Sequence, residues 1–134
     1  MKKIRAAVAV TAVAAATAVA AVPALAAGGT VSVTLKEFKV IPSAKSVSAG
    51  KVTFKVTNTG TLTHELIVVK TDLAPLKLKK GNEADESASV GEVSETGAGK
   101  SGSVTLTLKP GKYVLLCNVP GHFLAGQYTT FTVK

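Results

Sequence analysis

The side chains best suited to bind a soft metal ion are few in this chain. Cys117 is its only cysteine, and His64 and His122 are its only histidines. His122 follows Cys117 by five positions, and Gln127 follows His122 by five more. A thiolate and two imidazoles suit a type-1 copper site, in which an amide oxygen can serve as the weak fourth ligand. The set therefore predicts one type-1 copper ion per chain, bound by His64, Cys117, His122 and Gln127.

Other uses of these residues fit the sequence less well. Structural zinc prefers a fourth strong ligand, which the chain does not supply. Catalytic zinc needs a general base, and the nearest acid in sequence, Glu65, should point away from the site by strand alternation. A Cys–His nucleophile pair would need a second orienting group and a larger cleft. A buried structural cysteine with two unrelated histidines is the alternative that involves no ligand.

The segments that carry these residues have the pattern of β-strands. Hydrophobic and polar residues alternate in TVSVTLKEF, KVTFKVTN and SVTLTLK, which is typical of strands with one buried face. HELIVVK and KYVLLCN are more continuously apolar, which indicates central strands covered on both faces. QYTTFTVK adds a last strand, and turn signals such as Pro110-Gly111 separate the segments. We predict an all-β domain, an antiparallel Greek-key β-sandwich or barrel.

The ends of these strands should bring the four residues to one pole of the domain. His64 begins its strand with the parity of the apolar positions that follow, so its side chain should face the core. Cys117 ends its strand and Gln127 begins the next, and antiparallel neighbours place starts and ends at the same pole. The loop 118–126 between them should then carry His122 over that pole.

Residues 72–102 interrupt the strand pattern. Their middle part is acidic and rich in small residues, and three lysines precede it. We predict a long excursion between strands, with a short helical turn near residues 72–78. A mobile surface loop and a loop that docks a partner both fit this composition.

The first 26 residues have the pattern of a secretory signal peptide. Three basic residues precede an apolar run over residues 6–22, and Ala24-Leu25-Ala26 is an A-x-A cleavage site. A membrane anchor is the alternative, but the run is rich in alanine and ends in a good cleavage site. We therefore expect a signal peptide over residues 1–26, a single domain over residues 27–134, and a periplasmic or extracellular location.

Export bears on the charge and on the single cysteine. Removal of the signal peptide lowers the formal net charge from +8 to +5, without the clustering of a nucleic-acid-binding arm. One cysteine cannot form an internal disulfide. In an oxidising compartment a lone thiol has to be buried, paired with another chain or bound to metal.

Two segments of the sequence, VTFKVTNTGTLTHELIVV and LKPGKYVLLCNVPGHFLAGQY, resemble the cupredoxins, the small blue-copper proteins. The resemblance covers nearly the whole mature chain and rests on an upstream histidine, the C-x4-H motif and a residue five positions further on. It implies that His64, Cys117 and His122 are the equatorial copper ligands. Gln127 stands where the family usually has an axial methionine, and stellacyanins resemble this chain in having glutamine there. The only methionine, Met1, belongs to the signal peptide.

The resemblance implies an exported carrier of single electrons and not an enzyme. It also implies that the backbone N–H of Glu65 donates to the Cys117 sulfur, and that a group near Asn58 steadies the loop before His64. The expected partners are redox proteins such as an oxidase, a reductase or a cytochrome, which would dock transiently near His122. We expect no nucleic-acid partner and no stable membrane span after cleavage of the signal peptide.

Two other functions use the same fold. A periplasmic copper carrier or buffer would employ the same ligands, although Cu(I) carriers favour thioether clusters and the mature chain lacks methionine. A metal-independent interaction domain would retain the fold without using the ligands.

Overall fold

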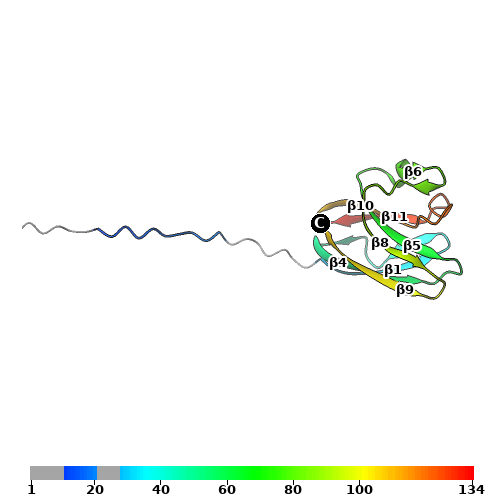
Figure 1. The fold of residues 1–134 in the computed structure, drawn as a ribbon, viewed down its shortest axis with the longest axis horizontal. Coiled ribbons are helices and arrows are strands. Elements are labelled where there is room, and N and C mark those ends of the chain that lie inside the picture. Colours follow the sequence, from blue (N-terminus) through cyan, green and yellow to red (C-terminus); the bar gives the residue numbers. More distant parts are fainter. Residues whose placement is uncertain (1–10, 21–27) are drawn as a thin grey trace, which may run out of the picture.

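The computed structural model describes residues 11–20 and 28–134 (Figure 1). The predicted signal peptide, residues 1–26, lies mostly outside the described residues, so the structure does not test it. Residues 11–20 have no regular secondary structure. Among the residues that the structure describes, no helix is long and apolar enough to span a membrane.

The domain consists of strands and one short 3₁₀ helix. In chain order the elements are β1 (Gly29–Lys36), β2 (Lys39–Pro42), β3 (Ser46–Val47), β4 (Gly50–Asn58), β5 (His64–Lys70), η1 (Pro75–Leu78), β6 (Lys79–Lys80), β7 (Glu83–Ala84), β8 (Ser89–Thr96), β9 (Ser101–Leu108), β10 (Gly111–Leu116) and β11 (Tyr128–Val133).

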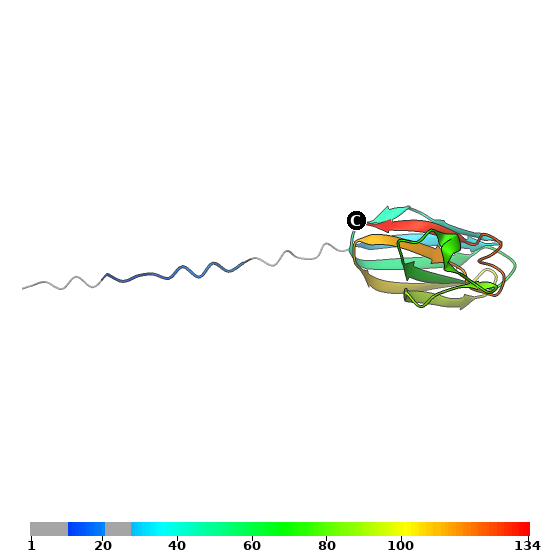
Figure 2. The same ribbon diagram turned by 90° about the horizontal axis from the view of Figure 1, so that it is seen from above.

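Two sheets form the sandwich. One has the strand order β2-β1-β4-β9 and the other β3-β11-β10-β5-β8, while β6 and β7 form a separate hairpin. Figures 1 and 2 show the loop that follows β10, in orange, at the end of the sandwich opposite the C-terminus. The all-β sandwich predicted from the sequence is confirmed. Two strand pairs are parallel, however: β1 pairs with β4, and β3 pairs with β11. In each case the chain passes through the other sheet between the two paired strands.

The alternating residues of the predicted strands form the core between the sheets. Each of the strands β1, β4, β5, β10 and β11 contributes every second residue, as period-2 patterning requires. The buried members are Val31, Val33, Leu35, Val52, Phe54, Val56, Leu66, Val68, Tyr113, Leu115, Phe131 and Val133, with Val40, Val93 and Leu108 beside them.

A second apolar cluster covers the outer face of β5 and β10. Both strands have buried side chains on both faces, which explains their continuously apolar sequences and confirms that prediction. The covering residues come from η1, β7 and the loop after β10. The cluster comprises Ile67, Val69, Leu78, Ala84, Val114, Leu116 and Phe123, with Tyr128 packed against it.

The prediction for residues 72–102 was correct only in its first part. The helical turn is present as η1, but residues 89–96 form β8, which pairs with β5 at the edge of the sheet. The sequence did not reveal this strand, because its residues are mostly acidic or small. Only Val93 and Thr96 of β8 are buried, so the hydrophobic alternation typical of a strand is missing. Gly91 lets β8 pack closely on β9, since a Cβ atom at that position would displace the end of the Leu106 side chain.

We predict that Phe54→Ala lowers the free energy of unfolding by about 3–5 kcal/mol, the usual loss for a large buried side chain. Phe54 is fully buried, and its ring meets that of Phe131 edge-on at 5.7 Å between centroids. Urea unfolding of the metal-free protein measures the change. Thr107→Ala, on an exposed position of β9, is the control and should change stability by less than about 0.5 kcal/mol. Equal midpoints for the two variants would contradict the assigned core.

Candidate metal centre

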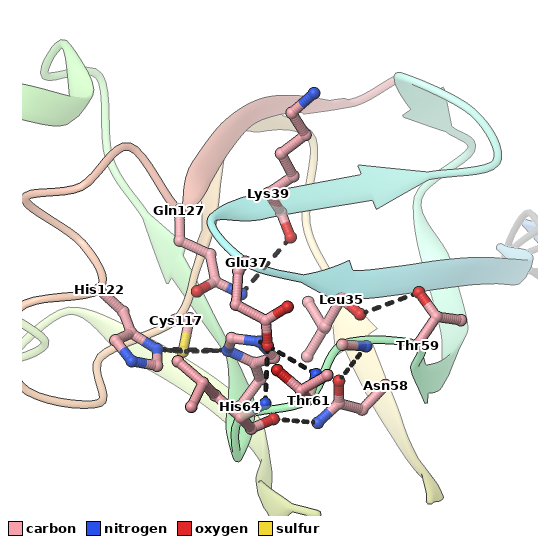
Figure 3. Close-up of polar contacts among 12 residues, drawn as sticks. Leu35, Glu37, Lys39, Asn58, Thr59, Thr61, His64, Cys117, His122 and Gln127 are labelled. Atoms are coloured by element: carbon pink, nitrogen blue, oxygen red, sulfur yellow. Dashed lines mark hydrogen bonds and ion pairs between the residues drawn. The ribbon is translucent and has the colours of Figure 1, made fainter. Parts of the chain in front are cut away.

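His64, Cys117 and His122 meet at one pole of the sandwich (Figure 3). His64 is the first residue of β5, and Cys117 directly follows β10. These strands pair antiparallel, with Leu116 opposite Ile67, so the start of β5 lies beside the end of β10. The structure thus places the three side chains together, as strand parity predicted for His64 and Cys117 and as the loop 118–126 predicted for His122.

The three potential ligand atoms are spaced as one metal ion would require. The Nδ1 atoms of His64 and His122 are 3.2 Å apart, and the Cys117 Sγ lies 3.9 Å and 3.6 Å from them, respectively. Bonds of about 2.0–2.3 Å in a trigonal arrangement give separations of roughly 3.5 Å between nitrogens and 3.8 Å to sulfur. The donor set therefore fits a single ion at the centre of the triangle.

Cys117 is fully buried, and its sulfur is held by the backbone. The N–H of Glu65 donates to Sγ at 3.5 Å, which confirms the contact implied by the family resemblance. Burial raises the pKa of the Cys117 thiol, although this N–H and that of Val119 act in the opposite direction. Because a metal binds the thiolate, binding at this site releases the thiol proton.

Strand alternation places the carboxyl group of Glu65 on the opposite face of β5 from the His64 side chain. Glu65 is half-buried, and its pKa is raised mainly by burial and further by the charges of Glu92 and Glu86. Glu65 therefore contributes its backbone N–H to the centre, and strand alternation carries its side chain away from it.

His122 is held by the loop 118–126. Its backbone N–H donates to the Val119 carbonyl at 2.9 Å, and its carbonyl accepts the N–H of Gln127 at 3.1 Å. His122 is 9 % exposed, and the Phe38 ring meets its imidazole edge-on at 5.2 Å between centroids. Burial, and then the charge of His64, lower the pKa of His122, while the charge of Glu37 acts against them.

Gln127 is fully buried beside this centre, immediately before β11. Its backbone carbonyl accepts the N–H of Cys117 at 3.0 Å, and its side-chain Nε2 donates to the Lys39 carbonyl at 3.4 Å. Its Oε1 has no hydrogen-bond partner among the described residues. A buried carbonyl oxygen without a partner costs about 1–3 kcal/mol, and a metal ion would supply the missing contact.

Asn58, at the end of β4, organises the loop that precedes His64. Its side chain is fully buried and makes three hydrogen bonds: Nδ2 donates to the carbonyls of Leu62 and Thr96, each at 2.8 Å, and Oδ1 accepts the Gly60 N–H at 2.9 Å. The expectation that a group near Asn58 steadies this loop is confirmed.

Sequence reasoning missed Glu37 and Phe38, which form the turn between β1 and β2. Glu37 Oε1 lies 3.1 Å from His64 Nε2 and accepts the N–H groups of Thr61 and Leu62 at 2.8 and 2.7 Å. These contacts, that of Leu62 foremost, lower the pKa of Glu37 to about 2. Because β1 lies beside β4 in the sheet, the turn that follows β1 comes close to the loop that precedes His64. The sequence of an extended segment with one turn does not show which strand it will pair with.

Residues 6–129 match the Cupredoxin-like domain family. A 37-residue segment, 27% of this chain, is 57% identical to Auracyanin-B of Chloroflexus aurantiacus but spans only 16% of that protein.

Solved structures of similar fold extend the comparison to most of the chain. Reduced auracyanin from Roseiflexus castenholzii has a TM-score of 0.63 and 26% identity, and the match covers 81% of this chain and 98% of that protein. Auracyanin A, a "blue" copper protein of Chloroflexus aurantiacus, has a TM-score of 0.59 and 25% identity over 80% of this chain and all of that protein.

We predict that Asn58→Ala lowers the free energy of unfolding by about 2–4 kcal/mol, because buried partners in the loop and in β8 lose their hydrogen bonds. Thermal or urea unfolding of the metal-free protein measures the loss. Asn82→Ala is the matched control, since Asn82 is exposed and its replacement should cost less than about 0.5 kcal/mol. Similar stability of the two variants would show that Asn58 does not support the loop.

Proposed function

Because this chain belongs to the family of cupredoxin-like domains, we propose that it is an exported type-1 copper protein that carries single electrons between redox partners. One observation carries the proposal: two imidazole nitrogens and one thiol sulfur, all buried, face one another within 4.8 Å. Auracyanin A, whose fold this chain shares, is a "blue" copper protein, which supports the same assignment. The export part rests on the signal-peptide pattern of residues 1–26 and the single domain proposed for residues 27–134.

The proposed ligands are the Nδ1 atoms of His64 and His122, the Sγ of Cys117 and, more weakly, the Oε1 of Gln127. Copper bound to this set would supply a one-electron couple. The chain's part is to hold the ligands still. The N–H of Glu65 holds the sulfur, and the pairing of β5 with β10 fixes the spacing of His64 and Cys117. The buried, unpartnered Gln127 oxygen would supply the weak fourth contact.

His122 is the proposed route for the electron. It is the ligand nearest the surface, at 9 % exposure, whereas His64 and Cys117 are fully buried. Phe38 and Leu124, which are 39% and 42% exposed, flank the pole, while the neighbouring Phe123 belongs to the core. A small apolar surface beside a ligand imidazole suits short-lived encounters with a redox protein such as an oxidase, reductase or cytochrome.

We predict that Cu(II) added to the metal-free protein produces intense visible absorption, and that Cys117→Ser abolishes it. The band arises from the copper–thiolate bond, which a hydroxyl cannot replace. Zn(II) should bind without colour. Asn82→Ala, which leaves the centre intact, is the control and should keep the band. Absorption that persists in Cys117→Ser would contradict the assigned ligand, and copper that leaves during redox cycling would favour the carrier alternative.

We predict that the reduction potential rises in the order wild type, Gln127→Met, Gln127→Leu. An amide oxygen is a harder and stronger donor than a thioether and favours Cu(II), while leucine offers no donor. Cyclic voltammetry of the three copper-loaded proteins measures the order. The leucine variant is the control for shape without a ligand atom. Three equal potentials would show that Gln127 does not contact the copper and that the site has three ligands.

A further inference from the structure

Glu37 lies outside the proposed ligand set, yet it contacts the far side of one ligand. His64 presents Nδ1 to Cys117 and His122, and its other ring nitrogen, Nε2, lies 3.1 Å from Glu37 Oε1 (Figure 3). The ring is fully buried, whereas the Glu37 side chain is 28% exposed. Glu37 is therefore placed between a buried imidazole and the solvent.

The surrounding backbone is arranged to receive this carboxylate. Its Oε1 accepts two successive N–H groups, from Thr61 and Leu62, in addition to its contact with the imidazole. Gly60 leaves the space that the carboxylate occupies, because a Cβ atom there would clash with both of its oxygens. Two separate segments, the β1–β2 turn and the loop before β5, thus fix the position of the carboxylate.

This contact determines which nitrogen of His64 carries the proton. A carboxylate only accepts hydrogen bonds, so the nitrogen that faces it must be N–H. In neutral imidazole the other nitrogen then has a free lone pair. For His64 that nitrogen is Nδ1, the one that faces the Cys117 sulfur. Carboxylates that accept from the second nitrogen of a ligating histidine orient the ring and increase its basicity.

We propose that Glu37 is a positioning residue for His64: it selects the tautomer with Nδ1 free for the metal, and its negative charge stabilises Cu(II) relative to Cu(I). The first part concerns the protein alone. The second part rests on the proposed copper function, because a charge one imidazole ring away acts more favourably on the more highly charged ion. A role limited to tying down the loop would use only the Thr61 and Leu62 contacts.

The first test uses metal-free wild-type protein and needs no variant. Nitrogen-15 NMR of the His64 ring should show Nε2 protonated and Nδ1 unprotonated, and a predominant Nδ1–H tautomer would overturn the proposal. In Glu37→Ala the preference should be lost, and Cu(II) affinity should fall about 10–100-fold, as is usual when such a partner is removed. An unchanged tautomer ratio in this variant would also count against Glu37.

The second test compares Glu37→Gln with Asp72→Asn in copper-loaded protein. Both remove one negative charge, but Asp72 is exposed and follows the far end of β5, roughly 20 Å away at about 3.3 Å per residue. Glu37→Gln keeps a carbonyl acceptor, so a role limited to the loop predicts little change. We expect the Cu(II)-to-Cu(I) affinity ratio to fall about tenfold, which raises the potential by about 59 mV. Equal potentials for the two variants would overturn the charge part.

The two proposals fail in different ways. If the wild type forms no copper–thiolate band, the proposed function and the charge part are wrong, and the tautomer measurement still decides whether Glu37 orients His64. If the band forms and neither tautomer nor potential depends on Glu37, the copper function stands and the positioning role is wrong.

Discussion

The antiparallel pairing of β5, β10 and β11 is the constraint on which the centre depends. It sets Leu116 opposite both Ile67 and Tyr128, so the residues just beyond these pairs fall at one pole. A shift of one residue in this register would turn the His64 side chain to the other face of the sheet. Both faces of β5 and β10 are packed against apolar side chains, and such a shift would therefore disrupt two clusters at once.

A buried polar centre is stable only if its hydrogen-bonding groups have partners. Asn58 satisfies the loop before His64, Glu37 satisfies the N–H groups of Thr61 and Leu62, and the Gln127 amide nitrogen reaches the Lys39 carbonyl. Among the described residues, the Gln127 Oε1 is the buried side-chain oxygen or nitrogen left over. An otherwise satisfied network with one free oxygen beside three converging ligand atoms is the arrangement expected of a preformed metal site.

The sequence predicted the long strands β1, β4, β5, β9, β10 and β11, but not the short strands β2, β3, β6 and β7. It also predicted the convergence of His64, Cys117 and His122, because period-2 patterning and strand parity are local properties that burial enforces. It did not predict β8 as a strand, since an edge strand with few buried residues lacks that pattern. It also missed Glu37. The contact between Glu37 and His64 spans 27 positions and depends on β1 pairing in parallel with β4, a long-range choice that no local pattern encodes.

The two histidines occupy different environments, so the buried side of the centre differs from the side nearer the surface. His64 is fully buried and faces the Glu37 carboxylate, whereas His122 is slightly exposed and faces the Phe38 ring. Glu37 and Phe38 are adjacent residues of a single turn, so one short segment supplies a charge to one imidazole and an apolar edge to the other. A charge is most effective where solvent does not screen it, and an apolar contact suits the side that a partner would approach. The β1–β2 turn therefore separates the group that tunes the metal from the surface through which an electron would leave.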